Sequence, residues 1–322
     1  MVELFNNKAE QFLCYLVTNL NNRENSKLKR IKSDNLFLYL FTTLGLTWYL
    51  GFIPFFLGLG GTSTGDTIFK LVAGPIPSFL ALIFIFATYT TEQKKDYFKR
   101  IIDFKQMGIK WPFLLMVFYA FVCGITIFIS GFFLNGKIPE FGGIRTLTIQ
   151  PYMIFLYLFF AIMSGPFNEE FGWRGFALDK LLVRYGFWIG SIILGIVWGI
   201  WHLPWYFYPG NGQYTLWNIS HIHGFMYIIS TITLSCVVSI LYIKTNRSIL
   251  SAFFSHMISN FFTGSLLIYP FDEKYIVTLL YVKIVLELLV IVYFSNNLTF
   301  KNEIKNQITI LKKESLWMMI LR

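Results

Sequence analysis

Long apolar runs recur along most of this 322-residue chain, and they restrict its fold more than any other feature. Crossing the hydrocarbon core of a bilayer as a helix takes about 17 to 25 residues, a length that these runs reach. In lipid the backbone must satisfy its own hydrogen bonds, so only helices or a closed barrel can span it, and barrel strands are shorter than these runs. The sequence therefore predicts an all-α, polytopic transmembrane bundle with about eight spans. The expected spans are 36–58, 68–90, 112–134, 152–182, 186–208, 222–243, 249–269 and 276–295.

Composition and charge placement agree with a membrane location. The chain is 55% hydrophobic and 14% charged, whereas soluble domains carry about 25% charged residues. Lysine and arginine gather in alternate loops and in both terminal regions, which predicts cytoplasmic termini. The net charge of +10 then indicates contact with anionic lipid head groups and not with nucleic acid. An Asn-, Lys- and Ile-rich composition favours a bacterial plasma membrane.

Three regions follow from these patterns. Residues 1–33 are expected to form a cytoplasmic N-terminal segment, and residues 34–295 the transmembrane bundle. The tail, 296–322, alternates lysine with isoleucine and leucine, which predicts a basic amphipathic helix on the inner leaflet. The residues that suggest chemistry lie within 152–269.

Two adjacent carboxylates, Glu169 and Glu170, lie within an apolar segment. Charged groups in lipid are costly, so an intramembrane acid pair suggests a functional site. Glu170 and Arg174 are spaced i,i+4 with the acid first, which favours an ion pair that holds the structure. Adjacent helical residues point about 100° apart, so Glu169 is expected to face a different direction and is the candidate general base.

Further polar residues are expected at the same depth. If the fourth and fifth spans form a hairpin that turns near residues 185–186, Glu169 and His202 each lie roughly 24 Å along their helices from that turn. On the seventh span His256 and Asn260 are spaced i,i+4 and share one face. Three helices would thus bring a carboxylate, two imidazoles and an amide into one layer. Lys283 and Glu287, also i,i+4, are expected to neutralise each other.

These residues form three motifs. Glu169, Glu170 and Arg174 match E-E-x-x-x-R, His256 and Asn260 match H-x-x-x-N, and Trp198 with His202 matches F-x-x-x-H except that Trp replaces Phe. In this order, each within an apolar span, they resemble the CAAX-protease and bacteriocin-processing family of intramembrane proteases. The resemblance covers roughly residues 152–269.

The resemblance implies peptide-bond hydrolysis within the membrane by a water that Glu169 and His202 activate. It assigns oxyanion stabilisation to His256 and Asn260, and support of the site to Glu170 and Arg174. Trp198 is expected to form an apolar wall that affects packing or substrate shape. The expected substrate is a membrane-associated peptide or protein, in bacteriocin or signal-peptide maturation or in self-immunity.

Whether a metal takes part is left open by the sequence. Glu169, His202 and His256 could supply three ligands of a catalytic zinc, but the absence of H-E-x-x-H favours a metal-free glutamate mechanism without a cofactor. Two other functions use the same residues. One is a proton- or ion-coupled transporter, and the other is a non-catalytic immunity or scaffold membrane protein.

Overall fold

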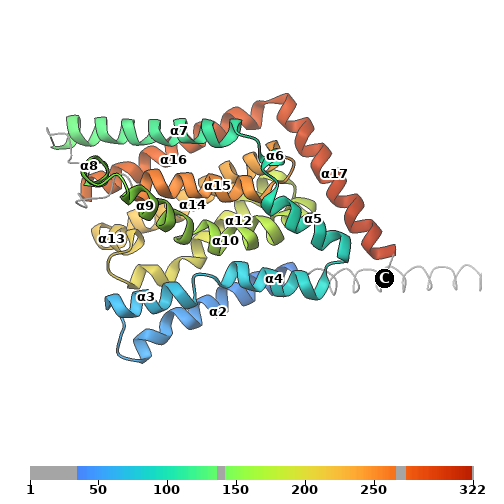
Figure 1. Cartoon of the computed structure of the whole chain (residues 1–322), viewed down its shortest axis with the longest axis horizontal. Coiled ribbons are helices and arrows are strands. Elements are labelled where there is room, and N and C mark those ends of the chain that lie inside the picture. The colour runs from blue at the N-terminus through green and yellow to red at the C-terminus, as the bar shows by residue number, and fades with distance from the viewer. Residues whose placement is uncertain (1–34, 136–141, 266–272, 321–322) are drawn as a thin grey trace, which may run out of the picture. The chain divides into compact units, whose positions relative to one another are not determined.

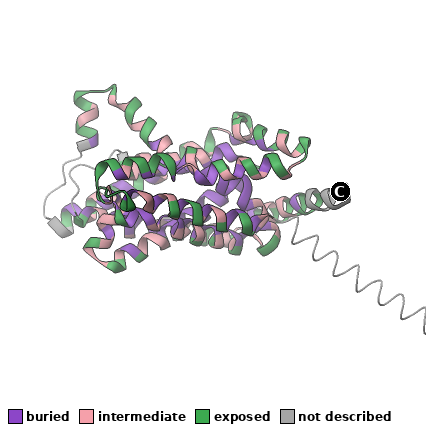
Figure 2. Cartoon of the chain, turned by 90° about the horizontal axis from the view of Figure 1, so that it is seen from below, coloured by how far each residue is buried: buried purple, intermediate pink, exposed green. Residues whose placement is uncertain are grey.

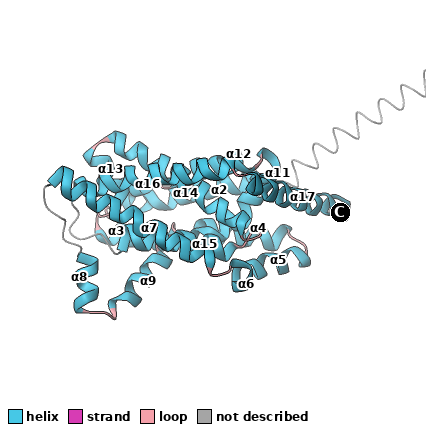
Figure 3. Cartoon of the chain, turned by 90° about the horizontal axis from the view of Figure 1, so that it is seen from above, coloured by secondary structure: helices cyan, strands magenta, loops and turns pink. Residues whose placement is uncertain are grey.

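A computed structural model describes residues 35–135, 142–265 and 273–320 of the chain. Within these residues every regular element is a helix and no strand occurs (Figure 3). The predicted all-α class is confirmed for this part of the chain. The chain divides into two units, Met1–Tyr39 and Leu40–Arg322, and the packing described below belongs to the second. The predicted N-terminal segment, 1–33, lies outside the described residues.

The helices are connected by short turns for most of the chain (Figure 1). In order they are α2 (Leu36–Phe56), α3 (Ser63–Val72), α4 (Ile76–Thr88), α5 (Thr91–Ile102), α6 (Phe104–Met107), α7 (Lys110–Phe128), η1 (Ile129–Asn135), α8 (Gly142–Ile149), α9 (Met153–Met163), α10 (Pro166–Gly172), η2 (Trp173–Leu178), α11 (Asp179–Tyr185), α12 (Phe187–Trp201), η3 (Leu203–Phe207), α13 (Gly212–Ile219), α14 (His221–Lys244), α15 (Ile249–Asn260), η4 (Phe261–Ser265), α16 (Glu273–Asn296) and α17 (Leu298–Ile320). The segments η1, η2 and η4 are π-helical, and η3 is a 3-10 helix.

Among the described residues six helical stretches are long and apolar enough to cross a membrane, where the sequence predicted about eight. They are Leu36–Phe56, Ser63–Thr88, Lys110–Phe132, Phe187–Phe207, His221–Lys244 and Glu273–Asn296. The two other expected spans, 152–182 and 249–269, carry the first and third motifs, whereas Trp198 and His202 lie on the candidate span Phe187–Phe207. The expected span 249–269 consists of α15 followed by the π-helical turn η4.

The expected span 152–182 is broken in two. Helix α9 ends at Met163, and Gly165 adopts an extended φ of −174° before α10 begins at Pro166. Proline suits the first position of a helix because its φ is preset and no amide hydrogen is needed there. The helix then continues through η2 and α11 to Tyr185. Glu169 and Glu170 consequently lie in the first two turns of a new helix, and not in the middle of a span.

The turn between α11 and α12 lies at Gly186, where the sequence predicted the hairpin. Helix α12 then packs closely along α14 (Figure 1). A Cβ on Gly195 would come within 2.6 Å of the Ile232 Cα, and one on Gly199 within 2.6 Å of the Thr231 Oγ1. Small residues four apart let two membrane helices approach through their backbones. This contact fixes the rotation of α12 about its axis, and with it the direction of Trp198 and His202.

Buried residues concentrate in the interior of the bundle, while exposed residues cover the outward helix faces (Figure 2). Many of the exposed side chains are large and apolar, for example Phe41, Phe121 and Tyr293. An apolar exterior is the arrangement that lipid stabilises. The buried set, in contrast, includes charged groups, among them the motif residues of α10, α12 and α15.

Candidate active site

Glu170 is fully buried and binds partners on two helices. Its two carboxylate oxygens accept hydrogen bonds from the Arg174 Nη1, at 2.8 and 3.0 Å, so the predicted ion pair is present. Its Oε1 also lies 2.8 Å from the Nδ1 of His256 on α15. An ionised carboxylate only accepts, so this Nδ1 carries the proton. Glu170 therefore links α10 to α15 and orients the His256 ring. The i,i+4 spacing of Glu170 and Arg174 within one helix did not predict this contact.

The second nitrogen of His256 lies close to the chain break between α9 and α10. A Cβ on Gly165 would be 2.7 Å from the His256 Nε2 and 3.0 Å from the Asn260 Nδ2. Only glycine fits there without a shift of the His256 ring, because the backbone itself approaches the imidazole. Gly165 is a site residue that the motifs missed, although the glycine-proline pair in an apolar run was a visible signal.

Asn260 lies one helical turn beyond His256, as its spacing predicted. It is less buried than the other motif residues, and its Nδ2 lies 3.4 Å from the Ser164 Oγ. Its amide therefore faces the Ser164–Gly165 break, on the same side as the His256 Nε2.

Glu169 is buried and makes a different set of contacts from its neighbour. Its Oε2 accepts a hydrogen bond from the indole Nε1 of Trp198 on α12. The prediction that Trp198 forms an apolar wall is thus wrong in one respect, since its polar edge binds a carboxylate. The reason is chemical: Trp carries an N–H that Phe, the usual residue of the motif, does not have.

His202 ends α12 and is held through the same tryptophan. Its Nδ1 lies 2.9 Å from the main-chain carbonyl of Trp198, and a carbonyl only accepts, so Nδ1 donates. In the neutral ring this leaves a lone pair on Nε2. The imidazole is packed between aromatic rings, with Trp201 at 4.7 Å and Tyr227 at 5.5 Å between centroids. In the described part of the chain no hydrogen bond joins Glu169 directly to His202; Trp198 connects them.

The Arg174 guanidinium packs against the face of the Trp198 ring. Its guanidinium carbon lies 4.7 Å from the centre of the Trp198 ring, a cation–π distance. The side chain is fully buried, and its Nε and Nη2 have no hydrogen-bond partner among the described residues. Arg174 thus holds Glu170 through Nη1 and Trp198 through its face.

A catalytic zinc ion needs three protein ligands close to one another. Within the described ranges no group of three or more His, Cys, Asp or Glu side chains lies close enough to hold a metal ion. Glu169, His202 and His256, the ligands considered for zinc, each contact Trp198: its indole N–H binds Glu169, and its ring centroid is 6.0 Å from His202 and 5.1 Å from His256. In this arrangement the three donors do not fit a zinc ion.

A second buried polar cluster lies on α7, α14 and α16. Lys283 and Glu287 form the predicted i,i+4 pair, with 3.2 Å between Nζ and Oε1. Glu287 also accepts hydrogen bonds from Tyr119 and Thr233, at 2.9 and 2.5 Å. This carboxylate is therefore satisfied by three donors, which supports a structural role.

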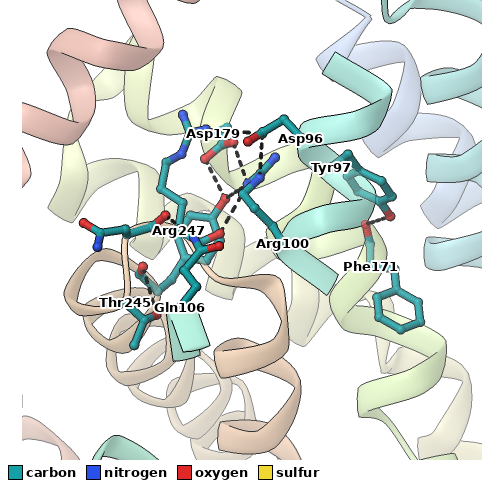
Figure 4. A network of polar contacts seen from close by, with 10 residues as sticks. Asp96, Tyr97, Arg100, Gln106, Phe171, Asp179, Thr245 and Arg247 are labelled. Atoms are coloured by element: carbon teal, nitrogen blue, oxygen red, sulfur yellow. Dashed lines mark hydrogen bonds and ion pairs between the residues drawn. The ribbon is translucent and has the colours of Figure 1, made fainter. Parts of the chain in front are cut away.

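A third network joins α5 to the helices of the site (Figure 4). Arg100 binds Asp179 at the start of α11 and the Tyr242 hydroxyl near the end of α14, at 3.3 and 2.6 Å. Tyr97 donates to the main-chain carbonyl of Phe171, the residue that follows Glu170, at 3.0 Å. Tyr97 and Arg100 therefore connect α5 to α10, α11 and α14. The sequence did not predict these contacts.

The fold and the site together define a class: a polytopic helical membrane protein that buries carboxylates, imidazoles and a guanidinium within its apolar bundle. Residues 151–262 match the family model described as type II CAAX prenyl endopeptidase Rce1-like. All six motif residues lie within that range. The chain is also 29% identical over 227 residues to CAAX prenyl protease 2 of Methanococcus maripaludis, which covers 69% of this chain and 82% of that protein. Over these residues the chain is similar to the Rce1-like CAAX prenyl endopeptidases, which are proteases.

Proposed function

We propose that the chain is an intramembrane endopeptidase in which Glu169 and His202 activate a water molecule against a peptide bond. The observation that carries this proposal is the separate support of the two glutamates. Glu170 is engaged by Arg174 and His256, while Glu169 accepts a hydrogen bond on Oε2 from Trp198. Glu169 thus remains a carboxylate with capacity to accept a proton, and Trp198 connects it to a second base, His202.

The proposed sequence of events uses only these side chains. Water loses a proton to Glu169 as its oxygen attacks the carbonyl carbon, and the lone pair on the His202 Nε2 accepts a hydrogen bond from the same water. His256, oriented by Glu170, and the Asn260 amide donate to the oxygen on which negative charge develops. Collapse of the tetrahedral intermediate returns the proton to the leaving amine. In this step His256 carries a proton on both ring nitrogens, so that Nδ1 donates to Glu170 and Nε2 donates to the developing oxyanion.

For the substrate we propose a peptide or protein anchored in the membrane near its scissile bond, because the site lies among apolar helices. The relative in Methanococcus maripaludis is named a prenyl protease, so a prenylated peptide is one candidate. A bacteriocin precursor or signal peptide, which carries no prenyl group, is the other. We further propose a plasma-membrane location with both termini in the cytoplasm and the basic loops against anionic head groups.

The test is cleavage of fluorogenic peptides by the purified protein in detergent, with prenylated and unprenylated versions of one sequence. Glu169→Gln and His202→Ala should each lower kcat/KM by about a hundredfold to ten-thousandfold, the contribution of general acid–base catalysis. Glu92→Gln, at an exposed position on α5, is the matched control and should cleave like the wild type. Undiminished cleavage by both site variants would contradict the proposal. Solute uptake into proteoliposomes that both variants abolish, without any cleavage, would favour the transporter.

A further inference from the structure

The Glu169 carboxylate accepts hydrogen bonds from fewer donors than the neighbouring Glu170 carboxylate. Glu170 receives hydrogen bonds from a guanidinium and an imidazole, whereas Glu169 receives the Trp198 indole N–H on Oε2. Among the described residues Oε1 of Glu169 accepts no hydrogen bond. A buried carboxylate without donors is costly, so the indole N–H has a large influence on where this side chain lies.

Trp198 touches each of the other groups of the site as well. Its main-chain carbonyl binds the His202 Nδ1 at 2.9 Å, its ring face covers Arg174, and its ring lies edge-on to His256 with centroids 5.1 Å apart. The family that this chain resembles has phenylalanine at this position of the motif. Phenylalanine also offers a main-chain carbonyl to His202, a ring face to Arg174 and a ring edge to His256. What it lacks is the N–H. The contact with Glu169 is therefore a property of this chain's own residue.

We propose that Trp198 is a positioning residue for the reaction: its indole N–H holds Oε2 of Glu169, so that Oε1 is left to accept the proton of the attacking water. This inference rests on the proposed function for its catalytic consequence, whereas the contact itself does not depend on it. The contact also fixes both bases to one residue of α12, because the same Trp198 binds Glu169 through its side chain and His202 through its carbonyl.

Trp198→Phe isolates the N–H because it keeps an aromatic ring and the main chain. We expect kcat to fall about tenfold or more, as loss of one hydrogen bond to a charged group implies, with KM changed less than about twofold. If Trp198 only filled space, the substitution would change kcat and KM together, or would change neither of them. If Trp198→Phe does not fold, benzothienylalanine at position 198 replaces the N–H by sulfur in a ring of the same shape, and the same loss is expected. A kcat equal to that of the wild type in either variant would overturn the positioning role while leaving the proposed protease function intact.

A double-mutant cycle on thermal stability tests the contact without any substrate. Trp198→Phe should lower Tm by about 2 °C or more in the wild-type background, and much less when Glu169→Leu has already removed the acceptor. The control is Trp201→Phe, which deletes an indole N–H that binds the Thr47 hydroxyl at 2.9 Å and should have the same effect in both backgrounds. Equal effects of Trp198→Phe in both backgrounds would refute the contact, whether or not the protein cleaves any peptide tried.

Discussion

Gly165 occupies a place where a side chain and the His256 imidazole cannot coexist. The space that a Cβ would need is already taken by the ring, 2.7 Å from both Cε1 and Nε2. The ring in turn is held on its other edge by Glu170, so it cannot move aside without losing that hydrogen bond. A backbone break with no side chain is therefore part of the site.

The substitution Gly165→Ala should impair catalysis more than folding. The added methyl group must displace the His256 ring, which weakens the 2.8 Å contact with Glu170 and moves the proposed oxyanion donor. We expect kcat/KM to fall by about tenfold to a hundredfold. This is less than the loss of about 2.7 to 4 kcal/mol that follows complete removal of one oxyanion donor, because the His256 ring is displaced and not deleted. Peptide cleavage with parallel thermal unfolding measures both effects.

A matched control is available on α7. A Cβ on Gly124 would meet nothing within 4 Å, so Gly124→Ala adds the same methyl group in open space. It should leave cleavage and stability close to wild type. If Gly165→Ala also cleaved at the wild-type rate, the close approach of Gly165 to His256 would have no functional importance.

Helix α5 contacts α10 and the π-helical segment η2 through Tyr97, although the sequence separates these elements widely. The Tyr97 hydroxyl donates to the Phe171 carbonyl, and a Cβ on Gly175 would lie 2.7 Å from the Tyr97 ring. Tyr97 thus packs directly on the backbone of the helix that carries both glutamates and Arg174. Burial raises the pKa of Tyr97, so its hydroxyl keeps its proton and remains a donor at physiological pH.

Tyr97→Phe should loosen this helix. Removing the hydroxyl deletes one hydrogen bond and should lower the free energy of unfolding by about 0.5 to 1.5 kcal/mol. Hydrogen exchange of residues 166–178 should become faster, since the packing of α10 and η2 loses a fixed point. Tyr293→Phe, at an exposed tyrosine of α16, is the comparison and should change neither quantity. Unchanged exchange in Tyr97→Phe would show that α5 does not stabilise the motif helix.

Contacts within one helix could be predicted from the sequence, and contacts between helices could not. Glu170 and Arg174 are i,i+4, so their ion pair follows from helix geometry. The pairing of Glu170 with His256, and of Glu169 with Trp198, depends on the rotation of α10, α12 and α15, which is set by close contacts such as that at Gly195. The break at Gly165 was missed because apolar composition reports length and not backbone continuity.

The placement of lysine-rich helices along the chain predicts how the protein is oriented in the membrane. Lysine-rich α5 and α17 are expected on the cytoplasmic side, and the turn between α8 and α9 on the opposite side. In a chain whose own cysteines are replaced by serine, cysteines introduced at the exposed positions Lys95 and Lys305 should react with an impermeant maleimide only after the membrane is opened. A cysteine at Gln150 should react in intact cells. Labelling of Lys305→Cys in intact cells would contradict cytoplasmic placement of the C-terminal tail.

The bonds among Glu170, Arg174 and His256 also have an electrical consequence. These groups are tied to one another across α10 and α15, and the surrounding bundle is apolar. Moving one elementary charge through the full membrane potential changes its energy by about 2.3 kcal/mol per 100 mV. In the proposed reaction the proton passes between neighbouring atoms of one layer, and no charged residue travels across the bilayer. Turnover should therefore be insensitive to membrane voltage, so the protein would work equally well in an energised and a depolarised cell.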